Sequence, residues 1–198
     1  EFSDGTVAGI NAWTWDGELE ERDVAIAMAA TYDVAGGAAV RPVPPVASGG
    51  NSFTFETSGL TIDLPEGWET SINEESGFVT LSSSETIYFP GWYYASNLEE
   101  LGLTQDDLVS VLADYFFPLD DTLTFDPSAV ELLHVEGHVV AYYEFVDSTS
   151  DGTQFTKINL ATPLDNGMVF VAEIFPRDGF EVTVTELNDA LSILLSAR

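Results

Sequence analysis

The two histidines of the chain, His134 and His138, have a His-x-x-x-His spacing that would place two metal ligands on one face of a helix. Here they flank Glu136-Gly137, a two-residue turn signal between two apolar, strand-like runs. In such a hairpin Val135 lies opposite His138, His134 lies opposite Val139, and successive side chains point to opposite faces. The two imidazole rings are therefore expected on opposite faces of the sheet, and no shared metal site is predicted.

Nucleophilic catalysis needs a Ser or Thr hydroxyl, a His base and an acid that orients the base. The chain has many serines but no Gly-x-Ser-x-Gly sequence, and neither histidine lies in a segment typical of a catalytic turn. Paired carboxylates are too frequent in this sequence to indicate a general acid and base. The sequence therefore predicts no catalytic residue and a non-enzymatic protein.

Acidic clusters are the candidates for a metal. Asp120 and Asp121 with Asp126, or Asp147 with Asp151, could supply loop oxygens to Ca²⁺, which takes six to eight oxygen ligands. Neither cluster has the Asp-x-Asp-x-Asp-Gly loop of a dedicated calcium site. A solvated acidic face that attracts cations diffusely is the competing interpretation. No cofactor is therefore predicted, and Ca²⁺ is the one alternative kept open.

The segment FPGWYY concentrates aromatic side chains. We predict a loop here, in which Phe89, Trp92, Tyr93 and Tyr94 form a binding patch for a protein partner or a carbohydrate. The alternative is that these rings pack against the end of the sheet, because aromatic side chains dominate protein cores.

The charge balance restricts the partners. The 198 residues include 34 acidic and five basic ones, and the net charge is −29. Phosphates would be repelled, which excludes nucleic acid and disfavours an anionic membrane surface. No apolar run is long enough to span a membrane, and there is no cysteine. An acidic surface with few lysines suits saline surroundings, so we expect an extracellular or cell-surface location.

The elements that must position these residues lie mainly in a domain over residues 52–198. Alternating patterns predict short strands in FTFE and LTIDL, near 78–81 and 86–89, and four further strands over 130–135, 138–145, 154–161 and 168–175. A helix is predicted from a Thr104 cap with Asp107 as the capping partner, and a second from Thr183 with Glu186. Their apolar stripes are Leu108, Val111, Leu112 and Tyr115, and Val184, Leu187, Leu191 and Leu194. The pattern predicts an α+β fold, an antiparallel sheet flanked by helices.

Two parts of the main domain are similar to a known family. They are the opening sequence Gly-Leu-x-x-x-x-Pro-x-Gly-Trp, from Gly59 to Trp68, and the closing strand and helix. Over about residues 53–195 the chain resembles the PsbP-like family of secreted modules. The resemblance implies an antiparallel sheet with helices on both sides and a mostly non-catalytic role, as in photosystem accessory subunits. It carries over no ligand residue, because no functional motif of the family can be matched.

Residues 1–34 resemble a second, partial copy of the end of the chain. GTVAGINAWTWDG from Gly5 aligns with GMVFVAEIFPRDG from Gly167, and each is followed by a helical pattern. A Pro/Gly-rich linker over 35–51 follows. We therefore expect residues 1–34 to be a strand–helix remnant of an upstream repeat that docks on a sheet edge, in cis or in trans with a second copy.

The combined prediction is an acidic, extracellular, non-enzymatic binding or assembly module whose partner is a protein, a cell surface or further copies of itself. The alternatives are a structural subunit that assembles by strand exchange through residues 1–34, and a Ca²⁺- or glycan-binding accessory domain.

Overall fold

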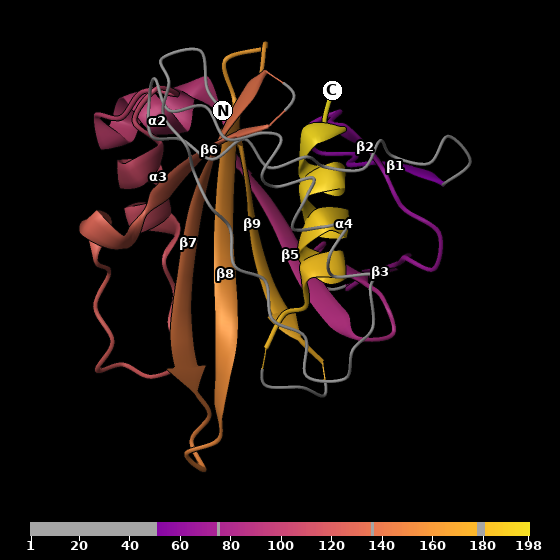
Figure 1. Ribbon diagram of the computed structural model, residues 1–198. Helices are drawn as coiled ribbons and strands as arrows, with labels where there is room; N and C mark the ends of the chain where they lie inside the picture. Colours follow the sequence, from indigo (N-terminus) through magenta and orange to yellow (C-terminus); the bar gives the residue numbers. More distant parts are fainter. Residues whose placement is uncertain (1–50, 75, 136, 178–180) are drawn as a thin grey trace, which may run out of the picture.

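The computed structural model describes residues 51–198 except 75, 136 and 178–180. The predictions for residues 1–34, and for all of the 35–51 linker except Asn51, lie outside the described residues. The elements are shown in Figure 1 and are, in chain order, β1 (Ser52–Thr54), β2 (Thr61–Asp63), β3 (Glu69–Ile72), β4 (Val79–Ser82), β5 (Thr86–Tyr93), α2 (Ala95–Leu101), α3 (Leu108–Tyr115), the 3₁₀ helix η1 (Pro127–Ala129), β6 (Glu131–Val135), β7 (His138–Ser148), β8 (Gln154–Pro163), β9 (Val169–Pro176) and α4 (Val184–Leu195).

The main sheet has seven strands in the order β3-β4-β5-β9-β8-β7-β6, and every pair of neighbours is antiparallel. β1 and β2 form a separate two-stranded antiparallel sheet. The strands β6 to β9 follow one another as consecutive hairpins, whereas β5 pairs with β9 from far along the chain. This arrangement confirms the predicted α+β class and leaves β3 and β6 as the edges of the described sheet.

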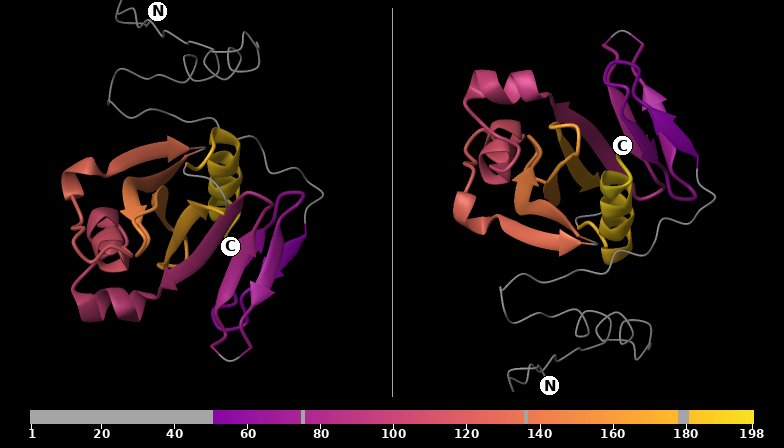
Figure 2. Two further views of the ribbon diagram at one scale, coloured as in Figure 1. Left: turned by 90° about the horizontal axis from the view of Figure 1, so that it is seen from below. Right: turned by 90° about the horizontal axis from the view of Figure 1, so that it is seen from above.

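Helices cover both faces of this sheet. Viewed from below or above, α2 and α3 lie on one side, and α4 with β1 and β2 lies on the other (Figure 2). Because side chains of a strand alternate between faces, each central strand supplies one set of residues to each side. In β9, for example, Phe170 and Ile174 face α4, while Val169 and Val171 face α3. We call the two sides the α4 face and the α3 face.

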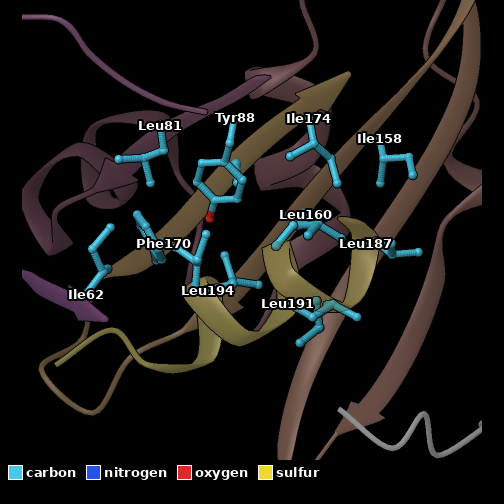
Figure 3. Packing of buried hydrophobic residues seen from close by; sticks show 14 of the residues in the cluster. Ile62, Leu81, Tyr88, Ile158, Leu160, Phe170, Ile174, Leu187, Leu191 and Leu194 are labelled. Carbon is cyan, nitrogen blue, oxygen red and sulfur yellow. The ribbon is translucent and has the colours of Figure 1, made fainter. Parts of the chain in front are cut away.

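The α4 face holds the larger core. Tyr88, Phe170, Leu191 and Leu194 are fully buried there, and Figure 3 shows the α4 leucines pointing at the sheet residues. Burying a side chain of this size contributes about 1.5–3 kcal/mol relative to leaving it exposed. This packing fixes α4 against β5, β8 and β9.

The capping box predicted for α4 is confirmed. Thr183 accepts a hydrogen bond from the Glu186 amide, and the Glu186 carboxylate accepts one from the Thr183 amide. The same buried carboxylate also accepts a hydrogen bond from the Thr86 hydroxyl of β5. A local cap thus also ties the start of the helix to the sheet. Val184, predicted on the core stripe, is exposed, because the stripe begins only at Leu187.

Three local predictions need correction. The helix cap is Asp107 and not Thr104, because the Asp107 carboxylate accepts the Ser110 amide and the Thr104 carbonyl closes a preceding turn. The sequence FPGWYY is largely strand, because its backbone continues β5 and pairs with β9 through Tyr93. The patterns also missed the short elements β3 and α2. No helix of the described residues is long and apolar enough to cross a membrane.

Candidate functional site

An apolar groove opens on the α4 face at the side of the sheet near β3. Its volume is about 200 Å³, and it lies between the β1 sheet and the β3–β4 hairpin. The lining residues are Phe53, Thr54, Phe55, Glu56, Thr57, Ile72, Gly77, Val79 and Trp92. Glu56 is the one charged side chain of this lining, in a chain of net charge −29. The groove is therefore suited to an apolar, uncharged guest.

The inner wall of the groove is aromatic and belongs to the core. The rings of Phe55 and Trp92 have centroids 5.0 Å apart, and Phe53 lies edge-on to Phe55 at 5.0 Å. Phe55 is buried, whereas Trp92 and Phe53 are partly exposed. On the outer side Ile72 of β3 is 53% exposed. The groove thus has a rigid aromatic wall and an open rim.

The β1–β2 sheet that forms one wall is fixed by the C-terminus. Thr61 and Arg198 exchange two backbone hydrogen bonds of 2.9 and 3.0 Å, which pair Arg198 side by side with the first residue of β2. The Arg198 guanidinium also donates to both carboxylate oxygens of Asp63, at 2.8 and 2.9 Å. This hydrogen bond, more than the charge of Arg198, lowers the pKa of Asp63 below its usual value, against a smaller opposing effect of burial. The terminal arginine therefore holds the groove wall in place.

The predicted aromatic patch is divided between the two faces of the sheet. Trp92 lines the groove on the α4 face. Phe89 lies on the α3 face, where its ring contacts Phe78 at 5.4 Å and Phe175 at 5.3 Å. The alternation of β5 separates the two rings, so one continuous patch of all four residues does not form.

The two tyrosines of the predicted patch have separate partners. The Tyr93 hydroxyl donates to Asp114 at 2.7 Å on the α3 face. The Tyr94 hydroxyl donates to the Thr57 carbonyl at 3.3 Å, next to the groove. Of the four predicted residues, only Trp92 and Tyr94 therefore lie near the groove.

The acidic candidates for Ca²⁺ have local structural contacts. Asp120 accepts hydrogen bonds from the amide and hydroxyl of Thr122, and Asp126 accepts the same pair from Ser128. These hydrogen bonds lower the pKa of both carboxyl groups. In the part of the chain that the structure describes, no three acidic or histidine side chains gather as metal ligands, Asp121 included. Binding of Ca²⁺ stays a prediction from the sequence.

The hairpin register predicted for the histidines is confirmed. His134 pairs with Val139, and His138 pairs with Val135. Both imidazole rings are exposed, and the register places them on opposite faces.

A buried ionic cluster on the α3 face was not predicted. Lys157 of β8, the only lysine of the chain, lies 3.0 Å from Glu173 of β9 and 3.4 Å from Asp147 of β7. Lys157 and Asp147 are buried and Glu173 is nearly so. The Lys157 ammonium group also donates to the Phe117 carbonyl at 3.1 Å and lies over the Phe145 ring. The signal in the sequence was the only lysine of the chain, placed within a predicted strand.

The pKa values of the two carboxyl groups in the cluster are shifted in opposite directions. Burial raises the pKa of Glu173, and the nearby Lys157 charge offsets this only in part. Burial also opposes ionisation of Asp147, but amides of Leu119, Asp120 and Ser148 donate to it. Those bonds and the Lys157 charge together hold the pKa of Asp147 below its usual value. As the pH falls, Glu173 is therefore the first of the two carboxyl groups to take up a proton, and Asp147 is the second.

Asn159 lies beside this cluster and is fully buried. Neither its amide nitrogen nor its carbonyl oxygen has a hydrogen-bond partner, although the residue pairs with Glu173 across the β8–β9 ladder. A buried amide without partners is costly, and sites of this kind often hold an internal water.

Comparison with solved structures gave a likeness at low sequence identity. Neither the family models nor the curated proteins gave a match to the sequence. Among solved structures, the chain is similar to the solution structure of cyanobacterial PsbP (CyanoP) from Synechocystis sp. PCC 6803. The sequence identity is 15%, the similarity covers 75% of this chain and 91% of that chain, and the TM-score is 0.44. The α+β architecture stated above rests on the chain's own strands and helices, and membership of the PsbP-like family stays a prediction.

Proposed function

We propose that this chain is a non-enzymatic, extracellular binding module that accepts an extended apolar segment in the groove beside β3. The observation that carries the proposal is the position of the groove next to an edge strand. All four residues of β3 are exposed, and Ile72 of that strand forms the rim of the groove. The extracellular location is supported by the composition alone, that is, by the acidic charge and the small number of lysines.

An edge strand binds an extended segment through its backbone. The outer N–H and C=O groups of β3 face away from β4, and such groups are a template for a further strand. Ile72 pairs with Val79, so the side chains of an added strand that align with them would point into the groove. A volume of about 200 Å³ is below the roughly 300–1,000 Å³ of cofactor and drug-sized sites. It suits one or two side chains of a bound strand.

Residues 5–15 of the chain are the occupant that we propose. They are uncharged, and a strand pattern would place Val7, Trp13 and Trp15 on one face. The described chain begins at Asn51, next to β1 of the groove wall. The seventeen residues of the linker could span roughly 50–60 Å when extended, which allows docking on the same molecule. Tethering gives this segment a high effective concentration, so docking in cis is favoured over exchange between copies.

Cysteine cross-linking tests this proposal cleanly, because the chain has no cysteine of its own. In the full chain, Asn11→Cys is combined with Ile72→Cys, and a second pair uses Val7→Cys in case the register differs. The matched control carries Val146→Cys in place of Ile72→Cys. Both residues lie on strands, and their exposed fractions are nearly equal, 53% for Ile72 and 54% for Val146. Electrophoresis without reductant separates an internal disulfide from a disulfide-linked dimer.

An internal disulfide that forms with Ile72→Cys but not with Val146→Cys is the expected result. A disulfide-linked dimer specific to Ile72→Cys would favour the structural subunit that assembles by strand exchange. Equal cross-linking at both positions, or none at either, would contradict the docking of residues 5–15 at β3.

A further inference from the structure

The segment between α3 and η1 exposes two large apolar side chains. It runs along one side of β7 without helix or strand (Figure 1). Phe117 is 77% exposed and Leu119 is 62% exposed, the highest values among the large hydrophobic side chains of the described residues. They are separated only by Pro118, whose fixed φ restricts the backbone between them. We call Phe117 and Leu119 the apolar pair.

The backbone of the apolar pair is held by the buried ionic cluster. The Phe117 carbonyl accepts a hydrogen bond from Lys157 at 3.1 Å. The Leu119 amide donates to Asp147 at 2.8 Å, and the Asp120 amide donates to the other oxygen of that carboxylate at 3.0 Å. Since the backbone groups point inward to the ion pair, the side chains of the apolar pair are directed outward.

The residue before the pair points the other way. Phe116 packs into an aromatic cluster, with ring centroids 4.9 Å from Phe145, 5.6 Å from Phe125 and 5.8 Å from Tyr143. This inward ring and the two hydrogen-bonded carboxylate oxygens of Asp147 fix the backbone on both sides of the apolar pair. The exposure of Phe117 and Leu119 is therefore built into the fold.

This arrangement lowers the stability of the folded state if the apolar pair contacts no other molecule. A buried ion pair costs desolvation free energy, and an apolar pair on the surface gains nothing from burial. A rigidly displayed apolar pair does favour binding, because less conformational entropy is lost when a partner packs against it. The ordering of the segment is thus better explained by a contact that the pair makes with another molecule.

The surrounding charge indicates what kind of partner fits. From Asp114 to Asp126 the chain carries four acidic residues and no basic one. Asp121, two residues after Leu119, is exposed. A second copy is a poor partner, since among the described residues it offers only Arg177 and Arg198 as exposed cations. We propose that the apolar pair docks a basic segment of another protein, in which Lys or Arg residues flank apolar side chains.

The docking is tested by selection from a displayed library of random peptides on the immobilised full chain in low-salt buffer. Enriched peptides are then measured against the double variant Phe117→Ser, Leu119→Ser. The control is Leu132→Ser, an exposed apolar residue on edge strand β6. Both serine positions lie on the surface, so folding is checked by circular dichroism and is expected to be unchanged.

We expect peptides that contain Lys or Arg beside apolar residues, with binding weakened at least tenfold by the double variant and unchanged in Leu132→Ser. Affinity should also fall with added NaCl, because charge attraction is screened. Failure to enrich such peptides, or equal binding to the double variant, would overturn the proposal. Loss of self-association in the double variant, seen by sedimentation, would overturn it in favour of contacts between copies. These results are independent of the groove, whose residues are unchanged.

Discussion

Replacement of Lys157 by Met is the most direct test of the buried cluster. Met keeps much of the apolar stem of lysine but removes the charge near Asp147 and Glu173, at 3.4 and 3.0 Å. Breaking a buried ion pair by removing one partner costs about 3–5 kcal/mol, because an uncompensated charge stays buried. Asp147 keeps its three amide donors, so most of the cost should come from Glu173.

The pH dependence of this cost follows from the protonation of Glu173. Burial raises the pKa of that carboxyl group, and without Lys157 the pKa should rise further. At mildly acidic pH the Glu173 carboxyl group takes up a proton, so the penalty in Lys157→Met should shrink. Urea denaturation of both proteins at pH 7 and pH 5 measures this difference. A loss of less than about 1 kcal/mol at pH 7, or an equal loss at both pH values, would refute the argument.

Three further predictions concern the net charge of the chain, the two buried carboxyl groups and the groove. With 34 acidic and five basic residues, the urea midpoint should rise with NaCl as self-repulsion is screened, and equal midpoints would contradict this. The free energy of unfolding should rise as the pH falls from 7 toward 4.5, because Glu173 binds its proton more tightly when folded. Below pH 3.8 the free energy of unfolding should fall, because the lowered pKa of Asp147 stabilises the folded state only while that carboxyl group is ionised. The Glu173→Gln variant should lose the rise between pH 7 and 4.5 but keep the fall below pH 3.8. Trp92→Ala should lower the free energy of unfolding by less than the about 3–5 kcal/mol that loss of a fully buried tryptophan costs. Ile72→Ser should leave the free energy of unfolding within about 0.5 kcal/mol of the parent. Equal losses of stability in the two variants would contradict the geometry of the groove.

Local patterns predicted much of the fold. The four strands β6 to β9 each alternate or form an apolar run between turn residues, and the Thr183–Glu186 cap lies within one helical turn. Such features depend on neighbours in sequence, so the sequence alone indicates them. The pairing of β5 with β9 could not be read in this way, because it joins segments separated by α2, α3 and three strands.

The same limit applies to the candidate sites. Trp92 was predicted to form one patch with its aromatic neighbours, but its separation from Phe89 depends on the strand that is present in place of the expected loop. The groove depends on β3, a short strand with no alternating pattern of burial. The Lys157 cluster depends on three strands that meet only through the sheet order. In each case the missing information was which distant segments become neighbours.

At both proposed surfaces a basic side chain holds the backbone, and this leads to a last prediction. Of the three cations in the described residues, two hold backbone segments beside exposed apolar side chains: Arg198 at the groove wall and Lys157 at the apolar pair. The Arg198–Asp63 pair is exposed and should be screened by salt, whereas the buried Lys157–Asp147 pair should not. The Thr61 amide, bonded to the Arg198 carbonyl, should therefore exchange its hydrogen faster in high NaCl relative to the Leu119 amide, bonded to Asp147. Hydrogen exchange resolved by residue measures this ratio, and a ratio independent of salt would show that the terminal arginine does not hold the groove wall.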